Sequence, residues 1–97
     1  MIDKIPGVTT IGGIAFDDVT YDRDGDVLYL WAGKPRSPRS DDASPEGHYL
    51  QFGENGELIA LTIVNARWLT ETEGKIVVTL PDGSKLESAG LGALLAA

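Results

Sequence analysis

The hydrophobic and polar residues of this chain alternate in several short runs, and this alternation predicts β-strands. Within residues 17–22, Val19 and Tyr21 alternate with polar neighbours, which is the period-two pattern of a half-buried strand. Residues 26–32 and 57–64 are apolar at odd and even positions alike, so we expect both faces of these two strands to be covered. With three further runs, the pattern predicts antiparallel strands near 17–22, 26–32, 48–53, 57–64, 75–80 and 84–88.

Turns that end in glycine separate the two strands of each predicted pair. A glycine at positive φ carries no Cβ penalty, so we expect this conformation at Gly25, Gly56 and Gly83. The predicted fold class is mainly β, β-rich with a short helical segment. We expect an antiparallel meander of about six strands built from three hairpins. Such a sheet either curls into a barrel or sandwich, or stacks against a second copy.

The length predicts a single domain over residues 1–97. Residues 1–15 form an N-terminal arm or an edge strand, with 8–11 as the strand and a glycine pair ending it. Residues 16–88 form the β core, and residues 89–97 a short C-terminal helix or tail.

Two segments within the β core carry no strand pattern. Residues 33–46 have three prolines, three serines and no large apolar side chain, so we expect a long solvated loop. Residues 65–74 are the internal candidate for a helical turn. Asn65 would cap this turn, Trp68 and Leu69 would pack against the sheet, and Gly74 would end it.

The first predicted hairpin also carries a family resemblance. A Tyr-Asp pair is followed by an acidic turn, an Asp and then Leu-Tyr, at positions Tyr21, Asp22, Asp26, Leu28 and Tyr29. Together with the run FGENGELIALTIVNAR, these positions resemble a small prokaryotic family called Domain of Unknown Function 2283. The resemblance covers about residues 18–69. It implies a small β-rich domain, and it brings no established activity and no catalytic residues.

The charge of the chain excludes some partners and favours others. The net charge is −7 and the pI about 4.4, which opposes binding to a phosphate backbone and favours a basic protein as any heterologous partner. There is no cysteine, and no apolar run approaches the roughly 18 residues that a membrane span requires. The N-terminus lacks the pattern of a signal peptide. We therefore expect a cytoplasmic protein that binds neither nucleic acid nor membrane.

Candidate chemistry is sparse. Asp22, Asp24 and Asp26 alternate as in a calcium loop, but the glycine falls at the fourth position and Gly33 occupies the twelfth, where such a loop places glutamate. His48 is the only histidine, and its neighbours in sequence offer no second ligand or orienting acid, so we expect a structural role. No catalytic residue, metal site or cofactor is predicted.

The aromatic residues point to association. Tyr29, Trp31 and Trp68 are the interface candidates, because tyrosine and tryptophan are favoured anchors of interfaces. A strand that is apolar on both faces also needs a second cover, so we expect a homodimer built on the sheet around Val27–Trp31. The predicted function is a protein-binding, self-associating module. The alternative is an enzyme that uses carboxylates, with or without a divalent ion.

Overall fold

The computed structural model describes residues 2–89 and 91–95 as one large sheet, two small hairpins and two helices. The large sheet is antiparallel and contains six strands in the order β1-β4-β5-β8-β7-β6. Its strands are β1 (Ile2–Ile5), β4 (Asp18–Asp22), β5 (Val27–Trp31), β6 (Ser40–Ala43), β7 (Tyr49–Phe52) and β8 (Leu58–Val64). The remaining elements are β2 (Thr9–Ile11), β3 (Ile14–Phe16), α1 (Ala66–Glu73), β9 (Lys75–Thr79), β10 (Lys85–Ala89) and α2 (Gly92–Leu95).

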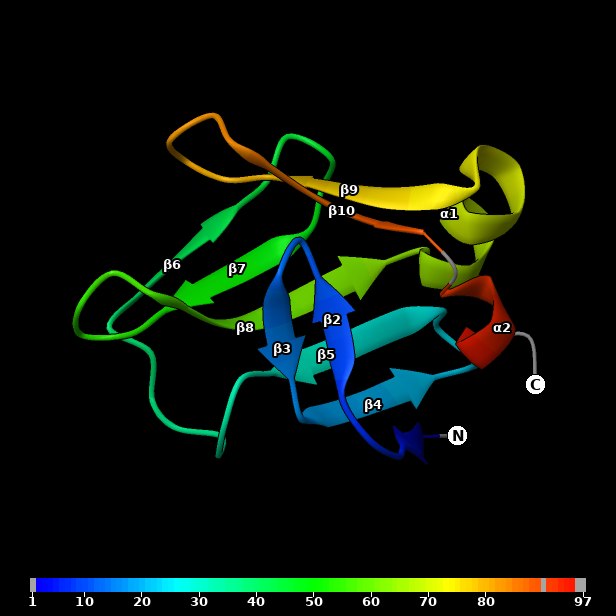
Figure 1. The fold of residues 1–97 in the computed structure, drawn as a ribbon, viewed down its shortest axis with the longest axis horizontal. Coiled ribbons are helices and arrows are strands. Elements are labelled where there is room, and N and C mark those ends of the chain that lie inside the picture. Colours follow the sequence, from blue (N-terminus) through cyan, green and yellow to red (C-terminus); the bar gives the residue numbers. More distant parts are fainter. Residues whose placement is uncertain (1, 90, 96–97) are drawn as a thin grey trace.

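The two hairpins and the helices cover one face of the sheet, which we call the inner face. Figure 1 shows β2–β3 crossing over β4, β5 and β8, with β9–β10 along the upper margin and both helices at one end. The core between the layers contains buried side chains from every layer, among them Phe16, Tyr21, Leu28, Leu30, Leu50, Leu61, Ile63, Ile76, Val78, Leu86 and Leu95. The fold is therefore a curled sheet with a second layer, and the described strands do not close into a barrel.

The mainly β prediction is confirmed, and each of the six expected strands is present within two residues of its predicted bounds. The order in the large sheet is not strictly sequential. After β5 the chain crosses to the far edge, forms β6 and β7, and returns so that β8 lies between β7 and β5. The third predicted hairpin, β9–β10, belongs to the covering layer instead of the large sheet.

Some strands were not predicted. The expectation that all of 33–46 is a solvated loop is wrong, because Ser40–Ala43 pairs with β7. All four of its side chains are exposed, and an exposed edge strand has no apolar alternation to reveal it. The 1–15 segment forms β1 at the other edge, and the predicted strand at 8–11 becomes a hairpin with residues 14–16.

The three predicted turns differ in conformation. Gly56 and Gly83 have φ of 79° and 89°, as expected. The prediction for Gly25 is wrong, because the residue at positive φ in that turn is Asp26, at 55°. Positive φ therefore occurs one position later than predicted, at an aspartate, a residue type that tolerates this conformation. Asp26 takes this conformation because its carboxylate accepts hydrogen bonds from the Tyr21 hydroxyl and from the start of α1.

Candidate interaction surface

The second face of the large sheet, which we call the outer face, is defined by side chains in cross-strand register. One row runs across four strands, because Thr20 pairs with Tyr29, Tyr29 with Thr62, and Thr62 with Tyr49. Parallel to it, Trp31 pairs with Ala60 and Val27 with Val64. The outer face therefore comprises Thr20, Val27, Tyr29, Trp31, Tyr49, Ala60, Thr62 and Val64. In the same register, Asp18 and Asp22 of β4 lie beside Trp31 and Val27, and Gln51 of β7 lies beside Ala60.

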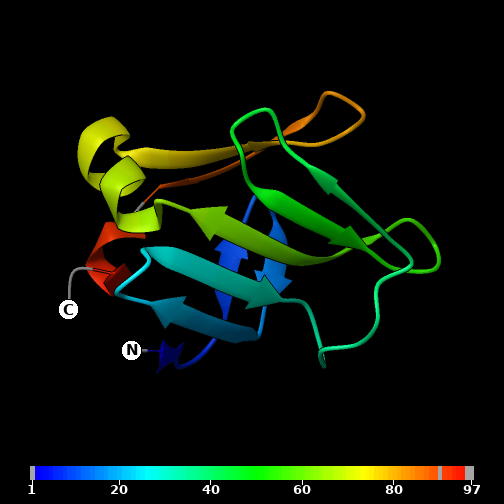
Figure 2. The same ribbon diagram turned by 180° about the vertical axis from the view of Figure 1, so that it is seen from behind.

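No described element of the chain lies over this face. Figure 2 shows β4, β5 and β8 uncovered, with the β2–β3 hairpin behind them. On the inner side of β5, Leu28 and Leu30 are fully buried, whereas Tyr29 on the outer side is 38% exposed and Tyr49 is 40% exposed. The chain itself therefore covers only one face of 26–32, and the expected cover of the second face would come from another copy. On its second side Tyr29 is exposed, and Val27 and Trp31 are half-buried.

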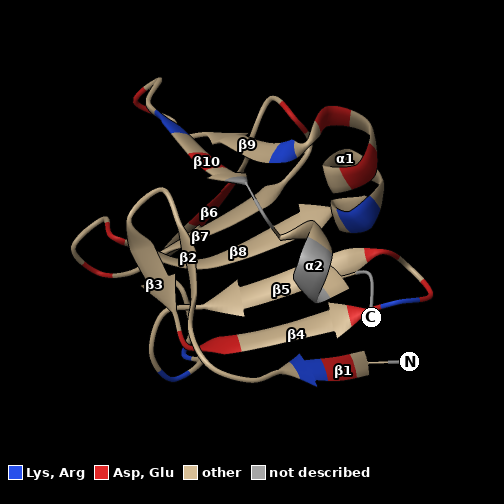
Figure 3. Ribbon diagram, turned by 45° about the vertical axis from the view of Figure 1, so that its right-hand side comes forward, with Lys and Arg blue, Asp and Glu red and all other residues tan. Residues whose placement is uncertain are grey.

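The middle of the outer face carries no charge. Strands β5, β7 and β8 contain no charged residue, and in Figure 3 their ribbons are uninterrupted tan. Charged residues stand only at its margins, where Lys4 forms an ion pair with Asp18 at 2.6 Å. On the opposite margin, a hydrogen bond to the Asp41 carboxylate raises the pKa of Tyr49 above its ordinary value. The outer face is thus a neutral aromatic strip on an acidic protein.

The structure brings two of the three interface candidates together. Tyr29 and Trp31 are alternate residues of β5 and share the outer face. Trp68 lies elsewhere, in the first turn of α1, a helix that packs against β9 and α2 of the covering layer. It is 57% exposed, so the expectation that it packs against the sheet is wrong, while Leu69 does pack against the core.

The positions of the family resemblance have mainly structural roles around Asp26. Its carboxylate accepts hydrogen bonds from the Tyr21 hydroxyl at 2.6 Å, from the Arg67 N–H at 2.7 Å and from the Trp68 N–H at 3.1 Å. Its backbone carbonyl also accepts the Ala66 N–H at 3.1 Å. The first N–H groups of a helix have no partner inside the helix. Asp26 supplies these partners from a turn some 40 positions earlier in the chain.

This arrangement replaces the cap that the sequence predicts. Helix α1 forms where expected and ends at Gly74, which has φ of 75°. Asn65, however, adopts a left-handed conformation with φ of 57° and makes no side-chain capping bond. A capping asparagine normally has extended backbone geometry, and Asn65 does not. The prediction of Asn65 as cap is therefore wrong, and Asp26 performs the role.

The ionisation of this site follows from its bonds. Partial burial would raise the pKa of Asp26, but the bonds from Tyr21 and from the two helix N–H groups outweigh it and hold the pKa below its ordinary 3.8. Burial, with the hydrogen bond to Asp26, raises the pKa of Tyr21 to about 12. The pair is thus a carboxylate and a neutral phenol at neutral pH, which suits a fixed structural link.

Asp22 is engaged with the backbone of the same turn. Asp22 Oδ1 accepts the N–H of Asp24 at 3.1 Å and that of Gly25 at 3.4 Å. In the part of the chain that the structure describes, no three His, Asp or Glu side chains gather in a way that could hold a metal ion. Asp22 therefore stabilises the hairpin turn and Asp26 caps the helix.

His48 is buried, with 1% of its surface exposed. Its Nδ1 accepts a hydrogen bond from the backbone N–H of Val64 at 3.2 Å, and the backbone N–H of His48 donates to the Ser44 hydroxyl at 3.1 Å. Burial lowers the pKa of His48 below its ordinary 6.5, with the nearby Glu46 charge opposing that shift. These contacts fit the structural role expected of this histidine.

Glu46 is a residue that sequence reasoning missed. Its carboxylate accepts the N–H of Thr79 at 2.9 Å and the Thr79 hydroxyl at 2.6 Å, which ties the loop after β6 to the end of β9. Slight burial would raise the pKa of Glu46, but these bonds lower it from 4.5 to about 2. The two residues are 33 positions apart, and no local pattern marks them as partners.

Comparison with known proteins assigns the sheet to a family. Residues 18–67 match the family described as "Protein of unknown function (DUF2283)". The match covers half of the chain, from the start of β4 to the first turn of α1, so the chain belongs to this family. No curated protein and no solved structure shows a significant match. Within the described residues, neither helix has the length and apolar character needed to cross a membrane.

Proposed function

We propose that this member of the DUF2283 family is a protein-interaction module that pairs with a second copy of itself through the outer face. The observation that carries the proposal is the contrast between the two sides of the large sheet. The inner side is covered over most of its area by the chain's own hairpins and helices, and on the outer side Tyr29 and Tyr49 are exposed and Trp31 is only partly buried. Tyrosine and tryptophan supply large contact area at low cost in side-chain entropy.

The charge distribution favours a second copy over a basic protein. A basic partner would gain most where acidic side chains gather, and the middle of the outer face has none. Two copies that stack the middle of this face bring only the uncharged strands β5, β7 and β8 together, although each chain carries a net charge of −7. A two-fold arrangement also places one self-complementary patch on both partners.

The area of the outer face sets the expected strength of dimerisation. Four strands about 4.8 Å apart and five residues long span about 19 by 17 Å, or roughly 330 Å² in projection. The accessible area of the side chains exceeds this projection, but remains below the ~800 Å² per partner of a standard interface. We therefore expect a dimer that forms at micromolar or higher concentration. A cytoplasmic location is part of the same proposal, since it rests on sequence features alone.

Sedimentation equilibrium over a concentration series tests the proposal. The wild-type chain should approach twice its 10.3 kDa mass at high micromolar concentration. Trp31→Glu should stay monomeric, because dimerisation would bury an unpaired carboxylate. Tyr29→Lys should also be monomeric, and because it lowers the net negative charge, its effect cannot be attributed to added repulsion. Trp68→Glu is the matched control, with the same substitution at an exposed tryptophan away from the outer face.

Each outcome decides a point. A wild-type chain that remains at 10.3 kDa throughout the series would refute self-association. A dimer that survives Trp31→Glu and dissociates with Trp68→Glu would place the interface at α1. Circular dichroism of each variant shows whether the β fold is retained. The outer-face variants should keep it, since Trp31 is only partly buried and Tyr29 is exposed.

A further inference from the structure

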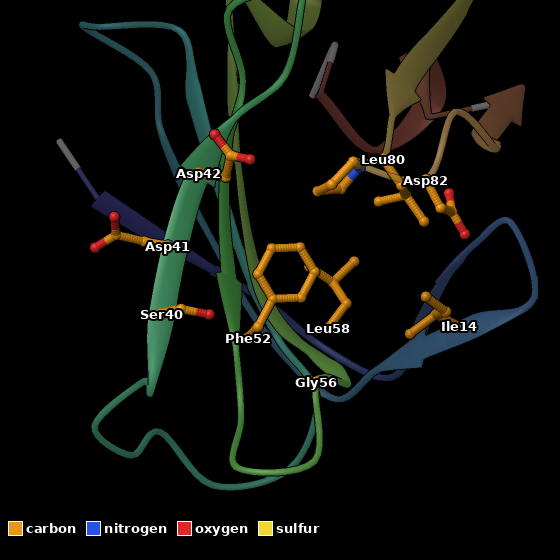
Figure 4. Close-up of a pocket in the computed structure, with 10 residues that line it drawn as sticks. Ile14, Ser40, Asp41, Asp42, Phe52, Gly56, Leu58, Leu80 and Asp82 are labelled. Carbon is orange, nitrogen blue, oxygen red and sulfur yellow. The ribbon is translucent and has the colours of Figure 1, made fainter.

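A cavity of about 490 Å³ lies on the inner side of the sheet, at the end where the covering layer stops. Figure 4 shows it between the β6–β7 edge on one side and the β9–β10 turn on the other. Its apolar wall comes from four separate segments, namely Ile14 of β3, Phe52 of β7, Leu58 of β8 and Leu80 after β9. This volume is within the range of small-molecule sites.

The shape of the strands explains why this wall is only partly filled. Opposite Gln51 and Phe52, strand β8 contains an extra residue, because Gln51 pairs with Ala60 and Phe52 with Leu58. Such a bulge bends its strand and increases the local twist. Leu58 and Phe52 pack against the core and remain only partly buried. The result is a preformed apolar surface that the chain's own residues do not cover completely.

Carboxylates stand beside this apolar wall. Figure 4 shows Asp42 on β6 and Asp82 on the turn at opposite sides of the cavity. Asp41 also lines the cavity, but its carboxylate points away from it and is hydrogen-bonded to Tyr49 of the outer face. Asp42 Oδ1 accepts the Ala43 N–H at 2.8 Å, and Asp82 Oδ1 accepts the Ser84 hydroxyl at 2.6 Å and its N–H at 2.9 Å. The Ser84 bonds lower the pKa of Asp82. The residues that line the cavity include no lysine or arginine to neutralise these charges.

We propose that this cavity binds a small organic cation, an ammonium or guanidinium group carried on an apolar body. The body would contact Phe52, Leu58 and Leu80, and the charged group would lie between Asp42 and Asp82. An anion would meet repulsion from both carboxylates, and a neutral apolar molecule would gain only the burial of its body. The site is independent of self-association, because it lies on the inner side of the sheet and pairing uses the outer face.

An NMR titration of the ¹⁵N-labelled chain tests this with three matched probes: phenethylammonium, 2-phenylethanol and 3-phenylpropionate. The three share a phenyl body and differ in charge. Phenethylammonium should shift the amide signals of residues 40–42 and 80–83 and bind more tightly than the alcohol, and 3-phenylpropionate should bind least. Raising the salt concentration should weaken the binding of the ammonium and leave that of the alcohol nearly unchanged.

Charge-neutralising variants locate the cation. Asp42→Asn and Asp82→Asn should each weaken phenethylammonium binding by about five-fold, the effect of one partly exposed ion pair. Asp41→Asn is the control, because it removes the same charge from the same strand while its side chain points away from the cavity. Its affinity should match that of the wild type. Each substitution keeps a side-chain oxygen that can accept the backbone bond of the original aspartate.

Three results would overturn the proposal. Equal binding of the ammonium and the alcohol would show an apolar pocket without charge selection. Equal weakening by Asp41→Asn and Asp42→Asn would show attraction to the net charge of the protein. Amide shifts confined to the outer face, or no shifts at all, would exclude the cavity as a site. Because the wild-type salt dependence and probe series need no variant, the proposal stays testable even where a substitution impairs folding.

Discussion

Two carboxylates link distant parts of this molecule, and the two links differ in how far they are buried. Asp26 joins the β4–β5 turn to the start of α1 through the N–H groups of Arg67 and Trp68 and also accepts the Tyr21 hydroxyl. Glu46 joins the loop after β6 to Thr79 at the end of β9. The Asp26 link is partly buried and involves the fully buried Tyr21, whereas Glu46 is exposed.

The two links also differ in the parts of the fold that they join. Asp26 acts almost wholly inside residues 18–67, the segment that matches the family. Thr79 lies beyond that segment, so Glu46 attaches the covering hairpin to the sheet. Within the matched segment, the partly buried Asp26 link joins the β4–β5 turn to α1. The exposed Glu46 link instead joins the covering hairpin β9–β10 to the sheet.

Removing Asp26 should have the largest effect. Asp26→Ala removes the bonds to the first turn of α1, which are worth about 0.5–2 kcal/mol, and leaves the buried Tyr21 hydroxyl without its partner at a further 1–3 kcal/mol. We expect a loss of about 3 kcal/mol in the free energy of unfolding, measured with urea. Tyr21→Phe, which leaves the helix bonds in place, should cost about 1 kcal/mol. A loss below about 0.5 kcal/mol in Asp26→Ala would equate it with an ordinary surface substitution and remove the distinction between the links.

Replacing glycine with alanine should cost more stability in the β9–β10 turn, where the glycine has positive φ, than in the β4–β5 turn, where it does not. Gly83 has φ of 89° and open space where a Cβ would lie, so Gly83→Ala should cost about 1 kcal/mol from backbone strain alone. At Gly25 the φ is not positive, and an added Cβ would meet the Asp22 side chain at 3.1 Å and that of Val27 at 3.6 Å. Gly25→Ala should therefore cost less. Equal losses in urea unfolding would show that the β4–β5 turn needs its glycine after all.

The smallest effect, and the most specific, should come from the charge of Glu46. Its pKa is lowered from 4.5 to about 2, so its contribution to stability is complete above pH 4.5 and is lost as the pH falls toward 2. Glu46→Gln should cost under about 1 kcal/mol at pH 7, because the site is exposed to solvent. Melting curves between pH 7 and pH 2 should show less acid destabilisation in Glu46→Gln than in the wild type. Parallel curves would argue against a charged Glu46–Thr79 link.

Local patterns predicted the strands whose one face is buried. The alternation at Val19 and Tyr21 identifies β4, because burial of one face imposes a period of two, and the short apolar run at Leu58–Val64 identifies β8 as a largely buried strand. Edge strand β6 has no buried side chain, so its pairing leaves no trace in the sequence. The apolar character of β5 on both sides was visible, but whether the second side is covered depends on the whole topology.

The candidate sites were less accessible to prediction, because each is assembled from distant segments. Tyr29 and Trp31 share a face by simple alternation, and the sequence shows this. Asp26 stands in a turn that looks acidic and exposed, and only its partners 41 and 42 positions later reveal a helix cap. The cavity between Asp42 and Asp82 depends on where the β9–β10 turn comes to rest, which no local signal fixes.

The cover of the inner face has a consequence for how the chain is made. Leu95 is buried in the core, and its carbonyl accepts a hydrogen bond from the Arg23 guanidinium, 72 positions earlier. During synthesis, the sheet strands leave the ribosome well before residues 75–95, so the part of the inner face that β9, β10 and α2 cover stays open until those residues emerge. At about 5–20 residues per second, that interval lasts roughly one to four seconds. Nascent chains in this interval should be the form most prone to aggregation and most in need of chaperones.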